Sequence, residues 1–207
     1  KKIDLKLESL KDIFEGKKKL YIHVNGVIGM KEAVMFAKKN NINDVVLVGA
    51  SESWRITDFL VKNNIEIILG RVHSLPTYID DDIDQYYKTP KILKDAGIVF
   101  CLDYHGDMER MGSRNLPFLA GTTVAYGLSK EEALELITLN TAKILEIDDR
   151  TGSLEVGKDA NLFVSTGDVL DIITNNIEFI FLMGKPLSIE NHQTKLNEKY
   201  LLKYNLK

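Results

Sequence analysis

The chain has 207 residues and a mass of 23.4 kDa, enough for one large domain or one domain with an appendage. Its 27 Lys and Arg residues against 30 Asp and Glu give a net charge of −3, which offers no electrostatic footprint for nucleic acid. The longest apolar runs are far shorter than the roughly 20 residues that cross a bilayer, and a single cysteine, Cys101, excludes an internal disulfide framework. We expect a soluble globular protein. Its compartment is not fixed by the sequence, and a cytoplasmic location is only slightly favoured.

The first two-thirds of the chain alternates helical patterns with short apolar runs. An amphipathic opening stretch, residues 5–14, precedes the first run. The runs are rich in β-branched residues and predict strands at 20–24, 45–48, 65–69 and 98–102. Apolar residues recur at helical spacing at 30–40, 53–63 and 89–96. This alternation predicts βαβ units that form a parallel sheet covered by helices.

The connection after the fourth predicted strand is long and polar, at residues 103–113. Asn115 then offers a helix N-cap, and a helix is predicted to about Tyr126. Ser129 and Glu132 form a capping-box pattern that opens a further helix reaching about Ile144.

The sequence pattern changes after Asp148, where glycines separate short β-prone runs at 162–164 and 177–183. A helical tail is predicted from about His192. These changes divide the chain into residues 1–148, a β segment at 149–190 and a tail at 191–207.

Three of the four histidines lie at or just past the ends of predicted strands: His23, His73 and His105. The carboxylates of Asp103 and Asp107 flank the last of them. In parallel α/β architectures that edge of the sheet binds ligands, and imidazole with carboxylate suits a divalent cation such as zinc. A single histidine at a strand end is more often a hydrogen-bonded structural residue, so both interpretations stay open on spacing alone.

Four sequence runs carry a resemblance to a known family. They are residues 115–121 (NLPFLAG), 127–134 (GLSKEEAL), 137–145 (ITLNTAKIL) and 152–162 (GSLEVGKDANL). Together they resemble the carboxyl-terminal part of the amidohydrolase superfamily, closest to its imidazolonepropionase-like members. With the upstream units, the resemblance extends over residues 4–187.

The resemblance implies an α/β fold, a partial (β/α)8 TIM barrel made of the last four βα units, with part of a small β-sandwich. It implies a hydrolase acting on carbon–nitrogen bonds other than peptide bonds, such as cyclic amides, with one or two divalent metal ions, zinc by expectation. His23 matches the family's fifth-strand metal ligand. Asp103 matches the eighth-strand aspartate, which contacts metal and transfers the proton. We expect Arg71, His73 and His105 to line the pocket for a small-molecule substrate.

The chain departs from the family pattern at several points. The sixth-strand histidine is replaced by the run Val48-Gly49-Ala50, and Glu146 stands where the family usually ends a helix with Gly. No segment supplies the first-strand His-x-His or the fourth-strand lysine. Because four strands leave a barrel half built, with two unpaired edges, we expect a fragment that is inactive alone and associates with the missing amino-terminal half or with itself. Lys1 in place of an initiating Met also favours a fragment.

Two further hypotheses compete with the hydrolase. A degenerate family member could bind a small ligand without hydrolysing it, as the missing sixth-strand histidine suggests. Independently of the resemblance, four βα units could form a doubly wound, flavodoxin-like binding module. The spatial order of the strands separates the folds, since 1-2-3-4 indicates a barrel and 2-1-3-4 a doubly wound sheet.

Overall fold

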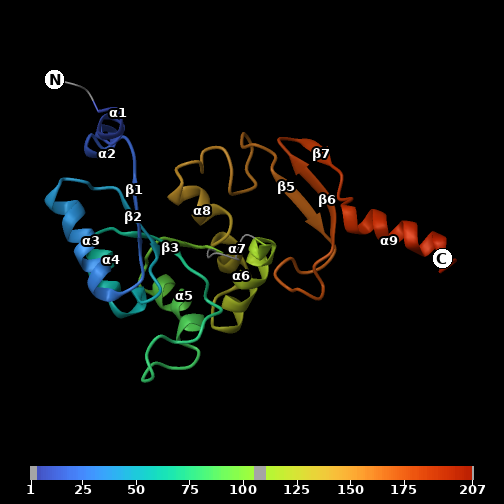
Figure 1. Ribbon diagram of the computed structural model, residues 1–207, viewed down its shortest axis with the longest axis horizontal. Coiled ribbons are helices and arrows are strands. Elements are labelled where there is room, and N and C mark those ends of the chain that lie inside the picture. The colour runs from blue at the N-terminus through green and yellow to red at the C-terminus, as the bar shows by residue number, and fades with distance from the viewer. Residues whose placement is uncertain (1–3, 105–110, 207) are drawn as a thin grey trace.

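The computed structural model describes residues 4–104 and 111–206. Strands β1 (Leu20–Val24), β2 (Val45–Gly49), β3 (Glu66–Leu69) and β4 (Phe100–Leu102) form one parallel sheet in the order β1-β2-β3-β4 (Figure 1). This is the order of consecutive barrel strands. It confirms the predicted partial-barrel fold and shows that the doubly wound alternative is wrong.

Helices cover the outer face of this sheet. They are α3 (Val27–Lys39), α4 (Thr57–Lys62) and α5 (Gln85–Asp95). Alternate strand residues face these helices, and Leu47, Ile67 and Phe100 are fully buried among them. The helix predicted at 53–63 is interrupted, because Ile56 leaves helical geometry between a 3₁₀ turn, η1 (Ser53–Arg55), and α4. The opening stretch likewise forms two single turns, α1 (Leu5–Glu8) and α2 (Lys11–Phe14).

A short helix packs on the inner face of the sheet, at the end where the strands begin. Helix α8 (Leu139–Ile144) places Ile144 against Val46 and Cys101 in a small buried cluster. The Ile144 carbonyl accepts hydrogen bonds from Lys19 Nζ and Tyr21 Oη, both at 3.1 Å. These contacts anchor α8 at the end where the strands begin. At the opposite end His23 is exposed, while Val48 beside it is buried.

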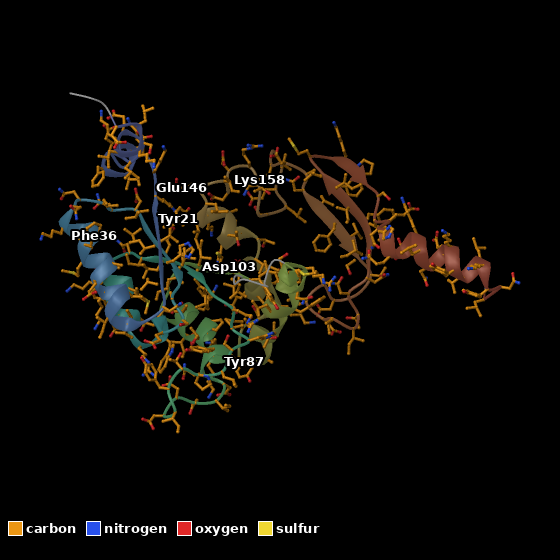
Figure 2. All side chains as sticks on the ribbon, viewed as in Figure 1. Tyr21, Phe36, Tyr87, Asp103, Glu146 and Lys158 are labelled. Carbon is orange, nitrogen blue, oxygen red and sulfur yellow. The ribbon has the colours of Figure 1, made fainter. Side chains whose placement is uncertain are left out.

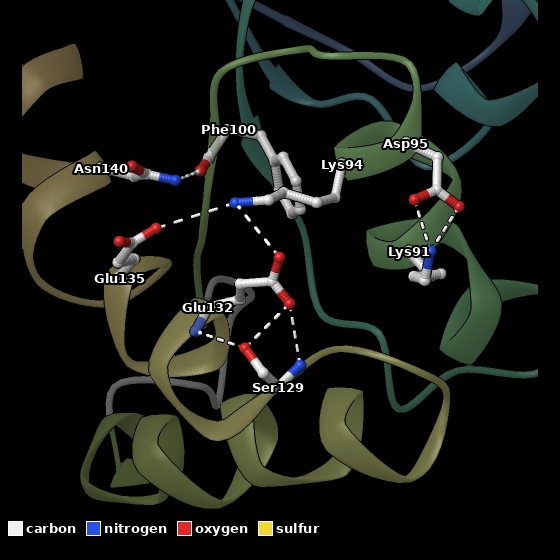
Figure 3. A network of polar contacts seen from close by, with 8 residues as sticks. All are labelled: Lys91, Lys94, Asp95, Phe100, Ser129, Glu132, Glu135 and Asn140. Carbon is white, nitrogen blue, oxygen red and sulfur yellow. Dashed lines mark hydrogen bonds and ion pairs between the residues drawn. The ribbon is translucent and has the colours of Figure 1, made fainter.

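The capping box predicted at Ser129 and Glu132 is confirmed. A 3₁₀ turn, η3 (Ser113–Asn115), leads into α6 (Leu116–Ala125), which is followed by α7 (Lys130–Glu135). The Ser129 N–H donates to Glu132 Oε2 at 2.8 Å and the Glu132 N–H donates to Ser129 Oγ at 3.2 Å (Figure 3). Asn115 occupies the N-cap of α6 but makes no side-chain cap bond. The helix predicted to continue to Ile144 is broken at Thr138, whose backbone is not helical, so α8 is a separate helix.

A second sheet follows, with β5 (Leu162–Ser165), β6 (Ile177–Leu182) and β7 (Lys185–Leu187) antiparallel in that order. Large apolar side chains are exposed on both of its faces: Val164 and Phe179 on one, Phe163 and Leu182 on the other. Helix α9 (His192–Lys203) ends the described chain and confirms the predicted tail. The division into three segments stays a prediction. Within 4–104 and 111–206, no helix has the length and apolarity needed to span a membrane.

The end of α8 is a Schellman motif that lacks its usual glycine. The Ile147 N–H donates to the Ala142 carbonyl at 2.9 Å and the Glu146 N–H to the Lys143 carbonyl at 3.0 Å. This pattern requires a left-handed residue, and Glu146 accordingly has φ of 57°. The position at which the sequence departs from the family is therefore one where the backbone favours glycine.

We expect Glu146→Gly to stabilise the chain by about 1 kcal/mol, because the left-handed conformation is strained for a residue with a Cβ. Urea unfolding of the two proteins measures the difference. Glu146→Ala is the matched control, since it also removes the 3.5 Å ion pair with Lys19 but keeps the Cβ. A Gly variant no more stable than the Ala variant would contradict the strain argument.

Candidate functional site

The carboxyl ends of the four parallel strands meet at one edge of the first sheet, and the candidate residues follow them. His23 lies on β1 beside Val48 of β2, with an exposed side chain. Tyr21, labelled in Figure 2, lies on the inner face, where its hydroxyl contacts α8. Side chains alternate along a strand, so His23 lies on the same face. This is the face that α8 leaves uncovered at the His23 end.

Asp103 directly follows β4 and is held by backbone contacts. Its N–H donates to the Leu69 carbonyl at 2.9 Å, which extends the pairing of β3 with β4. Its Oδ1 accepts from the Tyr104 N–H at 2.7 Å. By strand alternation it lies on the same side as Cys101, which is the inner face (Figure 2).

His23 and Asp103 therefore share a face and an edge but stand on the outermost strands. Two strands lie between them, and at a spacing of ~4.8 Å per strand a flat sheet would separate them by about 14 Å. Their donor types are those that zinc binds. Among residues 4–104 and 111–206, however, no three His, Cys, Asp or Glu side chains come together as a metal site. These two residues can supply only part of a ligand set.

At Gly49, the last residue of β2, a side chain would fit only if Asn25 moved. Gly49 has φ of 94°, and a Cβ there would lie 2.5 Å from Asn25 Oδ1. Ala50 follows with φ of 46° and is fully buried. The missing sixth-strand histidine is thus accompanied by a tightly packed backbone turn of small residues.

A buried carboxylate that sequence reasoning missed supports this turn. Glu52 Oε2 accepts from the Val27 N–H at 3.0 Å, and the Glu52 N–H donates to the Asn25 carbonyl at 3.2 Å. Its negative charge lies at the start of α3, where the helix dipole and free N–H groups favour it. The sequence signal for Glu52 is Gly26, the N-cap of α3. Gly26 has no side chain, so another residue must accept the N–H groups at the start of the helix.

The structure places His73 against two helices of the outer layer. Its Nε2 is 2.7 Å from Thr122 Oγ1 on α6, and its ring stacks on Tyr87 of α5 with centroids 5.5 Å apart. Partial loss of water around the ring and the nearby Arg71 guanidinium hold the pKa of His73 below its usual value. Arg71 lies two residues earlier, just after β3. His105 lies outside the described residues.

A second missed group connects two loops at the candidate edge. Arg55, in η1 after β2, stacks on Trp54 with its guanidinium carbon 4.1 Å from the ring centroid. It also lies over Tyr78 at 5.6 Å and forms an ion pair with Asp81, both in the loop after β3. The Asp81 side chain is only 7% exposed. Arg55 and Asp81 are 26 residues apart in the sequence, so only the fold reveals that Asp81 anchors this loop.

Cys101 is buried and its chemistry follows from that burial. Removal from water raises the pKa of its thiol to about 11. At pH 8 the native thiol should react with Ellman's reagent on the order of 100-fold more slowly than in the urea-unfolded chain, because only the thiolate attacks. Rapid labelling of the native protein would contradict this burial.

The lowered pKa of His73 predicts a pH dependence of stability. The unfolded chain binds a proton at this histidine more readily than the folded chain, so the free energy of unfolding should fall as pH drops below about 6.5. His73→Gln should flatten this fall between pH 7 and 5, by well under about 1 kcal/mol because the ring is largely exposed. Urea unfolding at both pH values tests it. The control His192→Gln, on exposed α9, should keep the wild-type slope.

Comparison with known proteins is consistent with this geometry. The model of the amidohydrolase family matches residues 12–189. An amidohydrolase from Thermotoga maritima MSB8 is similar in structure, with a TM-score of 0.79 and 25% identity, covering 91% of this chain and 48% of its own. An adenosine deaminase from Xanthomonas campestris with bound zinc shares the fold, with a TM-score of 0.55, 12% identity and coverage of 97% and 53%.

Among curated proteins, adenine deaminase 1 of Latilactobacillus sakei subsp. sakei (strain 23K) is 25% identical over 161 residues, which is 75% of this chain and 26% of the deaminase. The chain thus spans about half the length of these solved relatives and a quarter of the curated one. The imidazolonepropionase-like assignment stays a prediction. Because the family model matches most of its length, this chain belongs to the amidohydrolase family.

Proposed function

We propose that this chain supplies the carboxyl-terminal half of a metal-dependent hydrolase that cleaves carbon–nitrogen bonds other than peptide bonds, cyclic amides among them. The observation that carries the proposal is the placement of His23 and Asp103 on the inner face, at one edge of a barrel-type sheet, within a chain that matches the family. The adenine deaminase and the zinc-bound adenosine deaminase among its relatives support C–N hydrolysis.

The donor chemistry fits a divalent cation, zinc by our proposal, but the described residues do not complete a site. We propose that His23 and Asp103 would each donate one ligand atom, with further ligands coming from the other half of the barrel. The bound cation, one ion or two, would supply an acidified water at neutral pH. This chain alone is then expected to be inactive.

Asp103 would perform the proton transfer. Its Oδ1 accepts a hydrogen bond from the Tyr104 N–H, which helps to hold the carboxylate in place. It would accept the proton of the attacking water and deliver it to the leaving nitrogen. Arg71, His73 and His105 would line the substrate pocket. Because Nε2 of His73 is bonded to Thr122, His73 would contact the substrate with the ring edge away from Nε2.

The experiment uses the protein with its barrel complete. Zinc content is measured by mass spectrometry, and hydrolysis is assayed on a panel of cyclic amides and aminopurines. We expect Asp103→Asn to lower kcat by about 10²–10⁴-fold, the usual contribution of a general acid–base. His23→Ala should lose zinc as well as activity. His192→Ala, which removes an exposed histidine of α9, should change neither.

A non-catalytic ligand-binding protein is the second candidate, and the Gly49–Ala50 turn favours it because it presents no sixth-strand ligand. A folded, metal-free preparation that stays inactive with added zinc would defeat the hydrolase and support this candidate. An intact cellular role after Asp103→Asn would do the same.

A further inference from the structure

The hydrogen bond between His73 and Thr122 has a direction that a third residue determines. His73 Nε2 lies 2.7 Å from Thr122 Oγ1, and the Thr122 hydroxyl donates to the Phe118 carbonyl at 3.1 Å, one turn earlier on α6. A threonine hydroxyl has one proton and two lone pairs, whereas a carbonyl can only accept. Both bonds form together only if Nε2 of His73 carries a proton and donates it to Thr122. The reverse direction would give up the bond to Phe118.

This direction leaves the other ring nitrogen of His73 as a hydrogen-bond acceptor. A neutral imidazole carries one proton, so a proton on Nε2 leaves a lone pair on Nδ1. Partial loss of water around the ring and the Arg71 guanidinium lower the pKa of His73, so the neutral form predominates at pH 7. Among residues 4–104 and 111–206, Nδ1 has no hydrogen-bond partner.

The ring is held in a fixed orientation on an exposed residue. Tyr87, labelled in Figure 2, stacks on it with ring centroids 5.5 Å apart and 27° between the planes. The stack and the bond to Thr122 together restrict rotation of the imidazole. His73 is exposed in the loop that follows β3, at the edge of the sheet where the candidate residues gather.

We infer that His73 is a substrate-recognition residue whose Nδ1 accepts a hydrogen bond from the substrate, and that Thr122 is the positioning residue that fixes this tautomer. The inference rests on the proposed function, in which His73 lines the substrate pocket. The substrate class that fits is a nitrogen heterocycle with an N–H donor, either the ring N–H of a cyclic amide or the amino group of an aminopurine. A proton on Nδ1 would select the opposite feature, an acceptor, so the direction of the bond to Thr122 decides the specificity.

NMR of the histidine ring nitrogens tests the tautomer in this chain. With ¹⁵N-labelled histidine at pH 8, we expect the proton of His73 on Nε2 and the signal of an unprotonated nitrogen from Nδ1. His73→Gln assigns the signals. Thr122→Val, which removes the hydroxyl, should speed exchange of the Nε2 proton with water on the order of 10-fold, and Thr122→Ser should restore it. Thr123→Val is the matched control, because the Thr123 hydroxyl bonds Ala120 of its own helix.

The second measurement uses the protein with its barrel complete, carrying Asp103→Asn to slow turnover. Each N–H compound of the panel is added beside its N-methylated counterpart. We expect at least one N–H compound to move the Nδ1 signal of His73, and its methylated counterpart to leave the signal unchanged. His73→Phe keeps a ring against Tyr87 but removes the acceptor, so it should weaken binding of that N–H compound on the order of 10-fold without changing binding of the methylated one.

Three results would overturn the inference: a proton on Nδ1, Nε2 exchange that Thr122→Val leaves unchanged, or an Nδ1 signal that no N–H compound moves. None of these readouts requires hydrolysis. A protein that binds an N–H compound at Nδ1 but never hydrolyses it would therefore contradict the proposed hydrolase and support this inference.

Discussion

The constraint on which the structure depends is the pairing of strand edges. A parallel sheet satisfies the backbone of its inner strands, but each outer strand turns one row of N–H and C=O groups away from the sheet. At β4, two outward groups are bonded within the chain: the Leu102 N–H to the Leu136 carbonyl and the Phe100 carbonyl to Asn140. At β1, the outward groups of Tyr21 and His23 have no partner among the described residues. The His23 side chain is exposed next to this edge.

The candidate site is also incomplete, because the described residues provide only part of a metal-ligand set. His23 and Asp103 stand on the first and last strands of the sheet, so a ligand set that used both would need the sheet to curve and further donors to come from outside the described residues. Gly49 and Ala50, at the end of β2, are small and tightly packed, and their side chains add no donor. At this edge of the sheet, Glu52 holds the start of α3 and Arg55 connects two loops.

The second sheet shows the same property on a larger surface. Phe163 and Phe179 are about half exposed on opposite faces, and no residue of β5, β6 or β7 belongs to a buried cluster. Apolar patches of this kind on a folded chain mark surfaces that another element covers. Both sheets thus contain the secondary structure that their sequences encode without the contacts that would bury it fully.

Local patterns determined the elements: β-branched runs predicted all four parallel strands, and the Ser129–Glu132 spacing predicted a capping box that forms as expected. They also placed His23 and Asp103 at strand ends, because strand limits depend on neighbouring residues. The tertiary structure alone decided the strand order, the bond of His73 to Thr122, 49 residues away, and the bond of Asn140 to the Phe100 carbonyl, 40 residues away. Such contacts join residues remote in sequence, and no local periodicity encodes which distant partner will satisfy a given polar group.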